Sequence, residues 1–531
     1  MAPAAGIARR DNPTEIKGAV AAALVGLRRL ALPLSIMALG AALRLSYVLQ
    51  SDFPLNDGGL FYLMTRELQQ AHYRLPAYTA YNGAGLPFAY PPLGFYLAGL
   101  AAGLSGWPLL TVMRFLPFLF TALALPAFYG LSRALLGSRQ QALLALAAFA
   151  LLPGAFAWPL MGGGVTRAPG LFFATLALWQ AYRLYTRGAR RYLLTTTLCA
   201  AGAVLSHPAM AWLTAFSGAL LFLTYGRSRR GLAHSLAAAV GTALLTAPWW
   251  GAVVARYGPG PFMAAGGAPE SPLAGLYALL TLRLSGEAGF PLLAGLALLG
   301  MAACLARRRY WLPVWLVAVL LLDPRTAVTT SALPLALLAG VGVSEQLLPA
   351  LAGDRLRAPR ALAPLALGFI LLYALIGTLT GQQPLLSGLG PGEREAMQWV
   401  AANTPPGSTF LVLTGDRAWG ADRSSEWFPV LAQRVSVATV QGSEWSPGFS
   451  ARTARYTALQ KCAGQGAGSL EQWAQGEGVT FDYLYVAKRP AVTLPGSTQW
   501  GAAALLAALP CDAHYRLVYD GPGAAVYWRQ R

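Results

Sequence analysis

The chain consists of long apolar runs separated by short segments that carry most of its arginines. Several runs hold about 20 residues, which is enough for a helix to cross roughly 30 Å of hydrocarbon. The apolar positions are continuous, whereas a membrane β-barrel would alternate apolar and polar positions, so the pattern predicts membrane-spanning helices. We expect eleven spans, at 30–50, 112–132, 141–159, 170–186, 192–207, 209–225, 232–253, 288–305, 310–322, 331–350 and 361–380.

Two further apolar stretches are not counted as spans. A crossing at 91–107 would move Arg133 and Arg139 to the outer side of the membrane, against the usual preference of basic residues for the inner side. The stretch 272–284 is shorter and contains Arg283. We expect both stretches to form re-entrant or interfacial helices.

The amino-acid composition narrows the class of protein to which the chain can belong. Of the 531 residues, 56% are apolar and 11% are charged, whereas about a quarter of the residues in a soluble protein are charged. This composition excludes a cytosolic enzyme, a disordered chain and a disulfide-dense secreted module.

The distribution of charged residues predicts how the chain is oriented in the membrane. Residues 1–380 contain 28 Arg and Lys against 10 Asp and Glu, whereas 381–531 contain 12 against 11. The basic residues cluster between apolar runs, which is typical of cytoplasmic loops, so we expect no nucleic-acid partner. The clusters place residues 1–29 in the cytoplasm, and eleven spans then place the C-terminus outside. The chain has only three lysines, which indicates a GC-rich genome and hence a bacterial plasma membrane.

Residues 381–531 follow the membrane domain, 30–380, and have the composition of a soluble protein. Short β-like runs at 410–413 and 483–487 alternate with helix-like stretches such as 392–403. This alternation predicts a small α/β domain on the outer side of the membrane.

The cysteines and histidines suggest a disulfide and no metal site. Cys462 and Cys511 are the only cysteines of the tail, and an even pair in an oxidising compartment favours a disulfide. The sequences CxxC and HExxH do not occur, and the four histidines have no ligand spacing.

Eight of the 28 basic residues before position 381 fall outside the predicted cytoplasmic segments. Among them, Arg114, Arg167 and Arg325 lie near the outer ends of predicted spans. Three guanidinium groups at one membrane level suit a clamp for an anionic phosphate. The alternative is contact with lipid headgroups, or an internal pair such as Asp323 with Arg325.

The first outer loop, residues 51–111, is rich in polar groups. Asp52 and Asp57 directly follow the first span, and Gly58 and Gly59 permit close backbone approach. A carboxylate at the membrane surface suits a general base that meets a lipid-borne substrate. The compatible alternative is that Asp57 caps the amphipathic helix that follows it.

Further along the loop, Tyr81, Asn82 and Tyr90 add aromatic and amide groups. Groups of these kinds line sugar sites, and they are equally typical of any interfacial loop.

Several of these features resemble the GT-C glycosyltransferases. They are an acid just after the first helix (LNDGG), a juxtamembrane helix, the element YPPLGFYLAG, an Arg-x-x-Pro sequence opening the next span (RFLPFLF) and an outer C-terminal domain. Within that superfamily the chain is most similar to family 39 and related bacterial enzymes, which include protein O-mannosyltransferases and the aminoarabinose transferase of lipid A. The resemblance is detailed over about 50 to 135 and architectural elsewhere.

The resemblance implies that a sugar moves, with inversion, from a polyprenyl-phosphate carrier to a protein, lipid or glycan acceptor on the outer face. It implies that Asp57 is the base and that Arg114 is functional. Such a donor carries its own leaving group, so the protein must supply a base and positive charge at the phosphate. His207 is a reserve acid or hydrogen-bond donor, or a structural histidine at a helix end. Asp52 and Glu67 are alternatives to Asp57.

The chain departs from the family at one point. Mannosyltransferases have two adjacent acids where this chain has Asn56 and Asp57. Mannosyl acceptor chemistry and metal dependence therefore stay open, and a divalent cation is a candidate cofactor.

Other classes of function are alternatives. A lipid or polysaccharide transporter or flippase without transferase chemistry would also have many spans, although the chain shows no convincing internal repeat. A scaffold that displays the outer domain, and an oligosaccharide polymerase or ligase, are the further alternatives.

Overall fold

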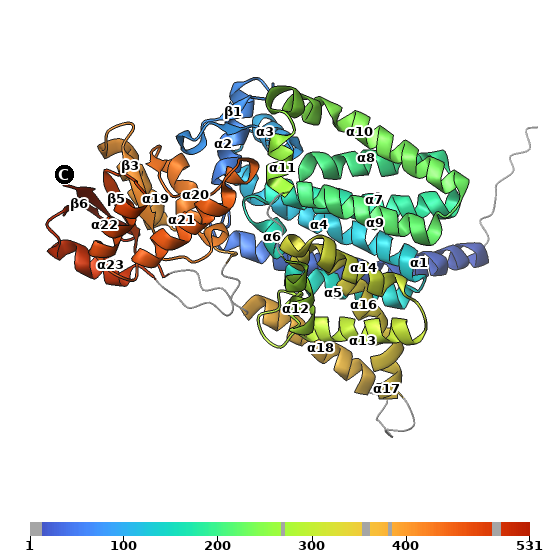
Figure 1. Ribbon diagram of the computed structural model, residues 1–531. Coiled ribbons are helices and arrows are strands. Elements are labelled where there is room, and N and C mark those ends of the chain that lie inside the picture. Colours follow the sequence, from blue (N-terminus) through green and yellow to red (C-terminus); the bar gives the residue numbers. More distant parts are fainter. Residues whose placement is uncertain (1–12, 267–270, 353–361, 381–384, 491–500, 531) are drawn as a thin grey trace, which may run out of the picture.

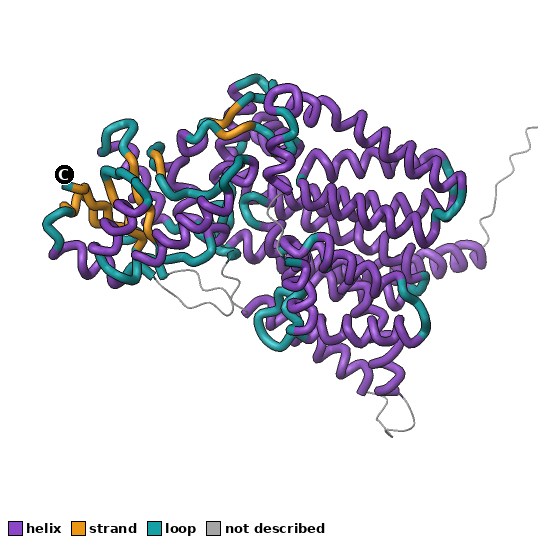
Figure 2. Tube along the Cα trace, in the orientation of Figure 1, coloured by secondary structure: helices purple, strands orange, loops and turns teal. Residues whose placement is uncertain are grey.

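The computed structural model describes residues 13–266, 271–352, 362–380, 385–490 and 501–530. Figure 1 shows two parts: a bundle of long helices, and an α/β part that follows residue 385 and lies at one end of the bundle. In Figure 2 the strands gather almost entirely in this second part.

The bundle is made of helices that run in both directions along one axis. They are α1 (Pro13–Leu49), α4 (Leu109–Leu136), α5 (Arg139–Leu151), α7 (Gly164–Arg187), α8 (Arg190–Ser206), α9 (Pro208–Tyr225), α10 (Arg229–Tyr257), α13 (Leu292–Ala306), α14 (Trp311–Leu322), α16 (Ala332–Gly342), α17 (Leu348–Ala352) and α18 (Leu362–Thr380). By length and composition, six helices of the described chain can cross a membrane, or seven if a pair bent by 104° after Leu322 is one span. The chain is therefore a polytopic helical membrane protein.

Each of the eleven predicted spans contains a helix, but some helices are shorter than predicted. The segment 141–159 is interrupted because α5 ends at Leu151 and extended Leu152 precedes Pro153, which starts a 3₁₀ turn. The segment 331–350 contains α16, five residues of π-helix and the start of α17. The number of spans stays a prediction.

Arg44, a basic residue inside the first predicted span, is fully buried. Its Nη1 donates to the carbonyls of Ala150 and Gly40, each at 2.8 Å, and the guanidinium lies 4.5 Å from the Phe156 ring centroid. Ala150 belongs to the last turn of α5, whose carbonyls have no partner within the helix. A cation there also complements the helix dipole. These structural contacts account for the presence of a buried arginine at this position.

Short elements connect the long helices near the α/β part. Between α1 and α4 lie α2 (Gly59–Gln70), the antiparallel pair β1 (Tyr78–Thr79) and β2 (Leu86–Pro87), and α3 (Leu93–Ser105). The other short helices are α6 (Ala157–Leu160), α11 (Gly260–Gly266), α12 (Pro272–Leu280) and α15 (Ala327–Thr330). The two apolar stretches that were not counted as spans contain α3 and α12, of 13 and 9 residues.

The α/β part contains one mixed sheet. Its strands are β3 (Thr409–Leu413), β4 (Val435–Ser436), β5 (Tyr483–Ala487), β6 (Tyr515–Asp520) and β7 (Ala524–Arg529), in the order β4-β3-β5-β7-β6. β3 is parallel to β4 and to β5, whereas β7 is antiparallel to β5 and β6. The helices are α19 (Pro391–Asn403), α20 (Arg423–Leu431), α21 (Phe449–Cys462), α22 (Ala467–Gly476) and α23 (Ala503–Ala508).

Both faces of the sheet are buried at the neighbouring parallel strands β3 and β5, as expected for strands of this kind. Leu411 and Leu484 belong to a core shared with α21, α22 and α23. Phe410 and Tyr485 face the other way, into a core shared with α19 and α20. The second core also contains Phe53 from the loop after α1, whose ring lies 4.6 Å from that of Trp427. The first loop is therefore built into the α/β part.

The two cysteines of the tail differ from the prediction. Cys462 and Cys511 are both free thiols in the structure. Cys462 is buried at the end of α21, with its Sγ 3.5 Å from the Ser469 carbonyl, whereas Cys511 is exposed. An even count of cysteines indicates a disulfide only if the fold brings the two side chains together, and this fold does not.

Candidate active site

The Asn56–Gly59 turn at the start of the first loop is held by two tight backbone approaches. Asn56 and Gly58 both have positive φ, of 51° and 120°. The Gly162 N–H donates to the Leu55 carbonyl at 2.7 Å, and a Cβ at Gly162 would lie 1.9 Å from the Asp57 carbonyl oxygen. The MGGG sequence before α7 therefore lies directly against the LNDGG sequence after α1.

The carboxylate of Asp57 lies at the N-terminus of α7. Its Oδ1 accepts a 2.8 Å hydrogen bond from the Gly163 N–H, and its Oδ2 is paired with the Arg167 guanidinium. Each of these two side chains is 11% exposed. The position of Asp57 before α2 predicted a helix cap, but α2 begins after Gly58 without a side-chain cap. The N-terminus that Asp57 stabilises is that of α7.

Arg167 is fixed from its other side by an aromatic ring. Its guanidinium carbon lies 4.5 Å from the Trp158 ring centroid, and Nη1 donates to the Trp158 carbonyl at 3.4 Å. The Trp158 ring meets the His207 ring edge-on at 5.1 Å. His207 Nδ1 accepts from the Ala209 N–H at 3.1 Å, so it caps α9, and the proton of a neutral ring is on Nε2.

Tyr90 lies beside this group. Its ring centroid is 4.9 Å from that of Phe61, 6.0 Å from that of His207 and 5.4 Å from that of Trp445. Burial raises the pKa of Tyr90 to about 12, so its hydroxyl stays protonated at neutral pH. Aromatic rings from the first loop, α6, α9 and the α/β part thus surround the Asp57–Arg167 pair on one side.

Arg325 follows the bent end of α14 and is exposed. Its guanidinium carbon lies 5.9 Å from the Phe449 ring centroid. Burial raises the pKa of Glu444, while the backbone and the guanidinium groups of Arg325 and Arg167 act in the opposite direction. The positive charges of Arg325 and Arg167 therefore both act to lower the pKa of one carboxylate of the α/β part, that of Glu444. The Asp323 carboxylate accepts from the Thr326 hydroxyl.

Arg114 has a different environment. Its Nε and Nη2 both donate to the Val48 carbonyl, at 3.1 and 2.9 Å, in the last turn of α1. Asp52 lies near it and pairs with Arg394 of α19 at 2.6 Å, and the hydrogen bond from Arg394 lowers the pKa of Asp52. The Asp52 side chain is 66% exposed. Of the three arginines predicted to clamp a phosphate, Arg167 and Arg325 both counter the rise that burial causes in the pKa of Glu444, whereas Arg114 binds a carbonyl at the end of α1.

Tyr81 and Asn82 contact the α/β part instead of lining an open site. The buried Tyr81 hydroxyl donates to the Glu426 carbonyl at 2.7 Å. Asn82 donates to the Ser436 carbonyl at 2.8 Å and accepts from the Ser436 N–H at 2.7 Å. Both residues therefore dock the β1–β2 region onto the α/β part.

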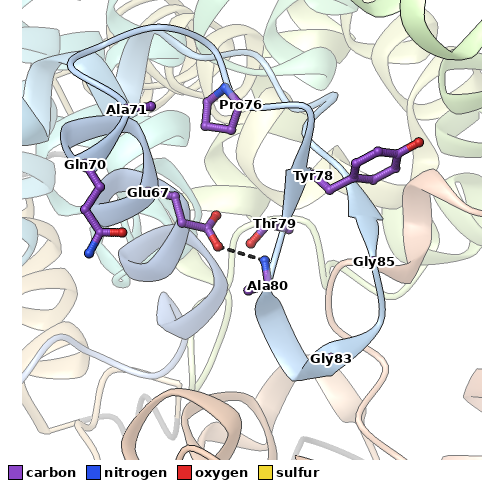
Figure 3. A pocket seen from close by; sticks show the side chains of 9 residues that line it. All are labelled: Glu67, Gln70, Ala71, Pro76, Tyr78, Thr79, Ala80, Gly83 and Gly85. Carbon is purple, nitrogen blue, oxygen red and sulfur yellow. Dashed lines mark hydrogen bonds between the residues drawn. The ribbon is translucent and has the colours of Figure 1, made fainter.

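Glu67 lines an open hollow of about 650 Å³ between α2 and the β1–β2 pair. Figure 3 shows its carboxylate reaching across to the Ala80 N–H, which donates to Oε1 at 2.7 Å. Burial raises the pKa of Glu67. The lining of this hollow includes Tyr78, Gly83 and Gly85 but neither Asp57 nor Arg167, so the hollow is distinct from the candidate site.

The α/β part contributes two glutamates that were not predicted from the sequence. The tripeptide Ser-Glu-Trp occurs twice in the tail, ending at Trp427 and at Trp445. Glu426 accepts from the Gly58 N–H at 2.8 Å, next to Asp57, and Glu444 is a carboxylate whose pKa is raised by burial and lowered by the charges of both Arg167 and Arg325. The repeated tripeptide was the signal that could have identified both glutamates.

The donor set at Asp57 does not fit a divalent cation. Both carboxylate oxygens are occupied, one by a backbone N–H and the other by a guanidinium. Among the residues that the structure describes, no cluster of three or more His, Cys, Asp or Glu side chains has the arrangement of a metal site. No step is therefore assigned to a metal ion.

Residues 89–251 match the family model of dolichyl-phosphate-mannose-protein mannosyltransferases. Comparison with curated protein sequences gives no match.

Solved structures are similar to almost the whole chain. ArnT from Cupriavidus metallidurans, bound to undecaprenyl phosphate, aligns with 93% of this chain and 97% of its own, at 14% identity and a TM-score of 0.54. The archaeal oligosaccharyltransferase AglB from Archaeoglobus fulgidus, in complex with an inhibitory peptide and a dolichol-phosphate, aligns over 86% and 69%, at 15% identity and a TM-score of 0.52. Arabinofuranosyltransferase AftD from Mycobacteria aligns over 93% and 40%, at 18% identity and a TM-score of 0.51.

Proposed function

Because this chain has the fold of the GT-C glycosyltransferases, as its sequence predicted, we propose that it transfers a sugar from a polyprenyl-phosphate carrier to an acceptor at the membrane surface. The observation that carries the proposal is the Asp57–Arg167 pair, in which a carboxylate that can serve as a base meets a guanidinium that can bind a phosphate, at the end of the bundle. The proposed orientation has the N-terminus in the cytoplasm and the α/β part outside, in a bacterial plasma membrane, as the basic clusters predict.

In the proposed reaction, Asp57 accepts the proton of the acceptor hydroxyl or amine. The acceptor atom then forms a bond to the anomeric carbon from the face opposite the phosphate, and the bond between that carbon and the phosphate oxygen breaks, so the configuration inverts. The polyprenyl phosphate leaves with the electron pair of the broken bond.

Arg167 and Arg325 are proposed to bind the phosphate as its charge increases. Positive groups fixed in a poorly solvated site stabilise such charge without reorganising. Arg167 uses Nη2 for Asp57 and Nη1 for the Trp158 carbonyl, so the residue that binds the phosphate also orients the base. Trp158, His207 and Tyr90 supply ring faces and edges of the kind that contact sugars.

The test uses membranes that contain the full chain and a labelled polyprenyl-phosphate sugar. Asp57→Asn keeps an oxygen that can accept from the Gly163 N–H but removes the base, so transfer is expected to fall by about 1,000-fold or more. The matched control is Glu345→Gln, which alters another carboxylate held by arginines, Arg307 and Arg309. Wild-type rates in a folded Asp57→Asn protein would remove Asp57 from the mechanism.

A transporter or flippase without transferase chemistry is the alternative, and one observation favours it. The pair of helices bent by 104° after Leu322 has the form of the broken helices found in transporters. In vesicles a transporter would move the intact lipid-linked sugar without forming a product with a new glycosidic bond. Transport without transfer, for every donor tried, would replace the proposal with this alternative.

A further inference from the structure

Helix α20 of the α/β part holds both sides of the Asp57 turn. The Gly58 N–H donates to Glu426 Oε1 at 2.8 Å, and the Trp427 Nε1–H donates to the Asn56 carbonyl at 3.0 Å. A Cβ at Gly59 would lie 2.7 Å from the Glu426 carbonyl oxygen. The residues before and after Asp57 are therefore bound to two consecutive residues of α20.

Helix α20 is itself well anchored. Asp422 Oδ1 accepts from the Ser425 N–H at 3.0 Å and so caps the helix. Trp427 and Phe428 are fully buried in the core that also contains Phe53. A shift of α20 would thus disturb the core of the α/β part, which makes the helix a rigid support for the turn.

The charged and titratable groups around Glu426 are Asp57, Arg167, Glu444 and Tyr81. Burial, and then the charge of Asp57, raise the pKa of Glu426 to about 8, while the Gly58 N–H and Arg167 act in the opposite direction. Burial near another negative charge disfavours the ionised form of Glu426. At neutral pH the hydrogen bond from Gly58 is therefore accepted by an uncharged carboxyl group.

We propose that Glu426 is a positioning residue for Asp57: its carboxyl group accepts from the Gly58 N–H and so holds the Asp57 turn in place, while Arg167 pairs with Asp57 and the donor phosphate. The inference rests on the proposed function, because it assigns a role through Asp57. It also makes the α/β part a component of the active site, because the support of the base comes from α20.

The uncharged state has a consequence for donor binding. An ionised Glu426 would add a negative charge beside the place where the phosphate binds, and it would compete with the phosphate for Arg167. Wild-type activity is therefore expected to fall as the pH rises through about 8. The fall should be larger in kcat/KM for the donor than in kcat.

The experiment compares the pH profiles of the wild-type chain, Glu426→Gln, Glu426→Ala and a control, Glu477→Gln. Glutamine keeps an oxygen for the Gly58 N–H and cannot ionise, so Glu426→Gln should have nearly wild-type kcat/KM at pH 7 and should lack the alkaline fall. Alanine removes the acceptor and lets the turn shift, so kcat at pH 7 should fall by about 100-fold. Glu477 pairs with Arg455 on the surface, so the control substitution Glu477→Gln should leave the pH profile unchanged.

A second measurement does not depend on activity. The infrared carbonyl band of a protonated carboxyl group should be present in the wild-type chain at pH 7, disappear as the pH rises through about 8, and be smaller in Glu426→Gln. Thermal unfolding of each variant in detergent shows whether it is folded. If Glu426→Ala fails to fold, Glu426→Gln and the infrared band still decide the question.

Three results would overturn the inference in an active wild-type chain. They are an alkaline fall that persists in Glu426→Gln, wild-type kcat in a folded Glu426→Ala protein, and a wild-type infrared spectrum without the Glu426 band. If the wild-type chain transfers no sugar from any polyprenyl-phosphate donor, the proposed function fails instead, and with it the role given to Asp57.

Discussion

The carboxylate of Asp57 pairs with the guanidinium of Arg167, a residue 110 positions further along the chain. The turn that carries Asp57 lies against the glycines that precede α7, so the two side chains approach from the ends of two different bundle helices. The pair is nearly buried, with 11% of each side chain exposed, which strengthens the interaction relative to one in water.

Arg167→Ala is expected to lower kcat/KM for the lipid-linked donor by about 100-fold or more, because one substitution removes the partner of Asp57 and the proposed phosphate-binding group. Arg167→Lys keeps the charge but loses the planar contact with Trp158, so it should restore only part of the activity. Steady-state kinetics with varied donor would measure both effects. Arg309→Ala is the matched control, because Arg309 also pairs with a carboxylate, that of Glu345. An Arg167→Ala protein with wild-type donor dependence would contradict the phosphate role.

Arg114→Ala is expected to act mainly on stability. The substitution removes two hydrogen bonds to the Val48 carbonyl, in the last turn of α1, and should lower the free energy of unfolding by about 1.5–3 kcal/mol. Thermal unfolding in detergent would record the change, and kcat/KM of the folded protein should stay within about threefold of wild type. A large rise in KM for the donor with unchanged stability would instead place Arg114 at the phosphate, as the family resemblance implies.

Gly162→Ala is expected to disrupt the Asp57 turn. A Cβ at this position would lie 1.9 Å from the Asp57 carbonyl oxygen, so the turn must move and the Asp57–Arg167 geometry must change. We expect a loss of transfer activity of about 100-fold and a destabilisation of about 1–3 kcal/mol. Gly251→Ala in α10 is the control, because its Cβ would meet no atom within 4 Å. Full activity in Gly162→Ala would show that the position of the turn is not critical.

The resemblance to GT-C enzymes was visible in the sequence because its motifs are local. LNDGG, the Arg-x-x-Pro element and the apolar runs each depend on neighbouring residues, and the periodicity of apolar residues predicts a helix wherever that helix packs. Spans such as 232–253 and 361–380 were predicted correctly as the helices α10 and α18 for this reason. Helix ends were less predictable, because they depend on contacts with other helices. For example, α5 ends at Leu151, and Arg44 of α1 donates to a carbonyl in the last turn of α5.

The roles of individual polar residues depended on partners that local patterns do not contain. Arg114 and Arg167 look alike in sequence, as single arginines near the outer ends of spans, yet one binds the carbonyl of Val48 and the other binds Asp57. Tyr81 and Asn82 looked like residues of a sugar site, but their partners belong to the α/β part. Glu426 was missed because 368 positions separate it from Gly58.

The sequence by itself determined that this protein is a bundle of membrane helices with a polar first loop and an α/β tail, because hydrophobic burial and backbone hydrogen bonding act over short stretches of chain. Only the tertiary structure decided which charged groups meet, because that depends on how the loop after α1, the glycines before α7 and helix α20 pack together. Burying an unpaired charge costs free energy, so a buried charged group is paired, and the packing of the elements in three dimensions determines which group is its partner.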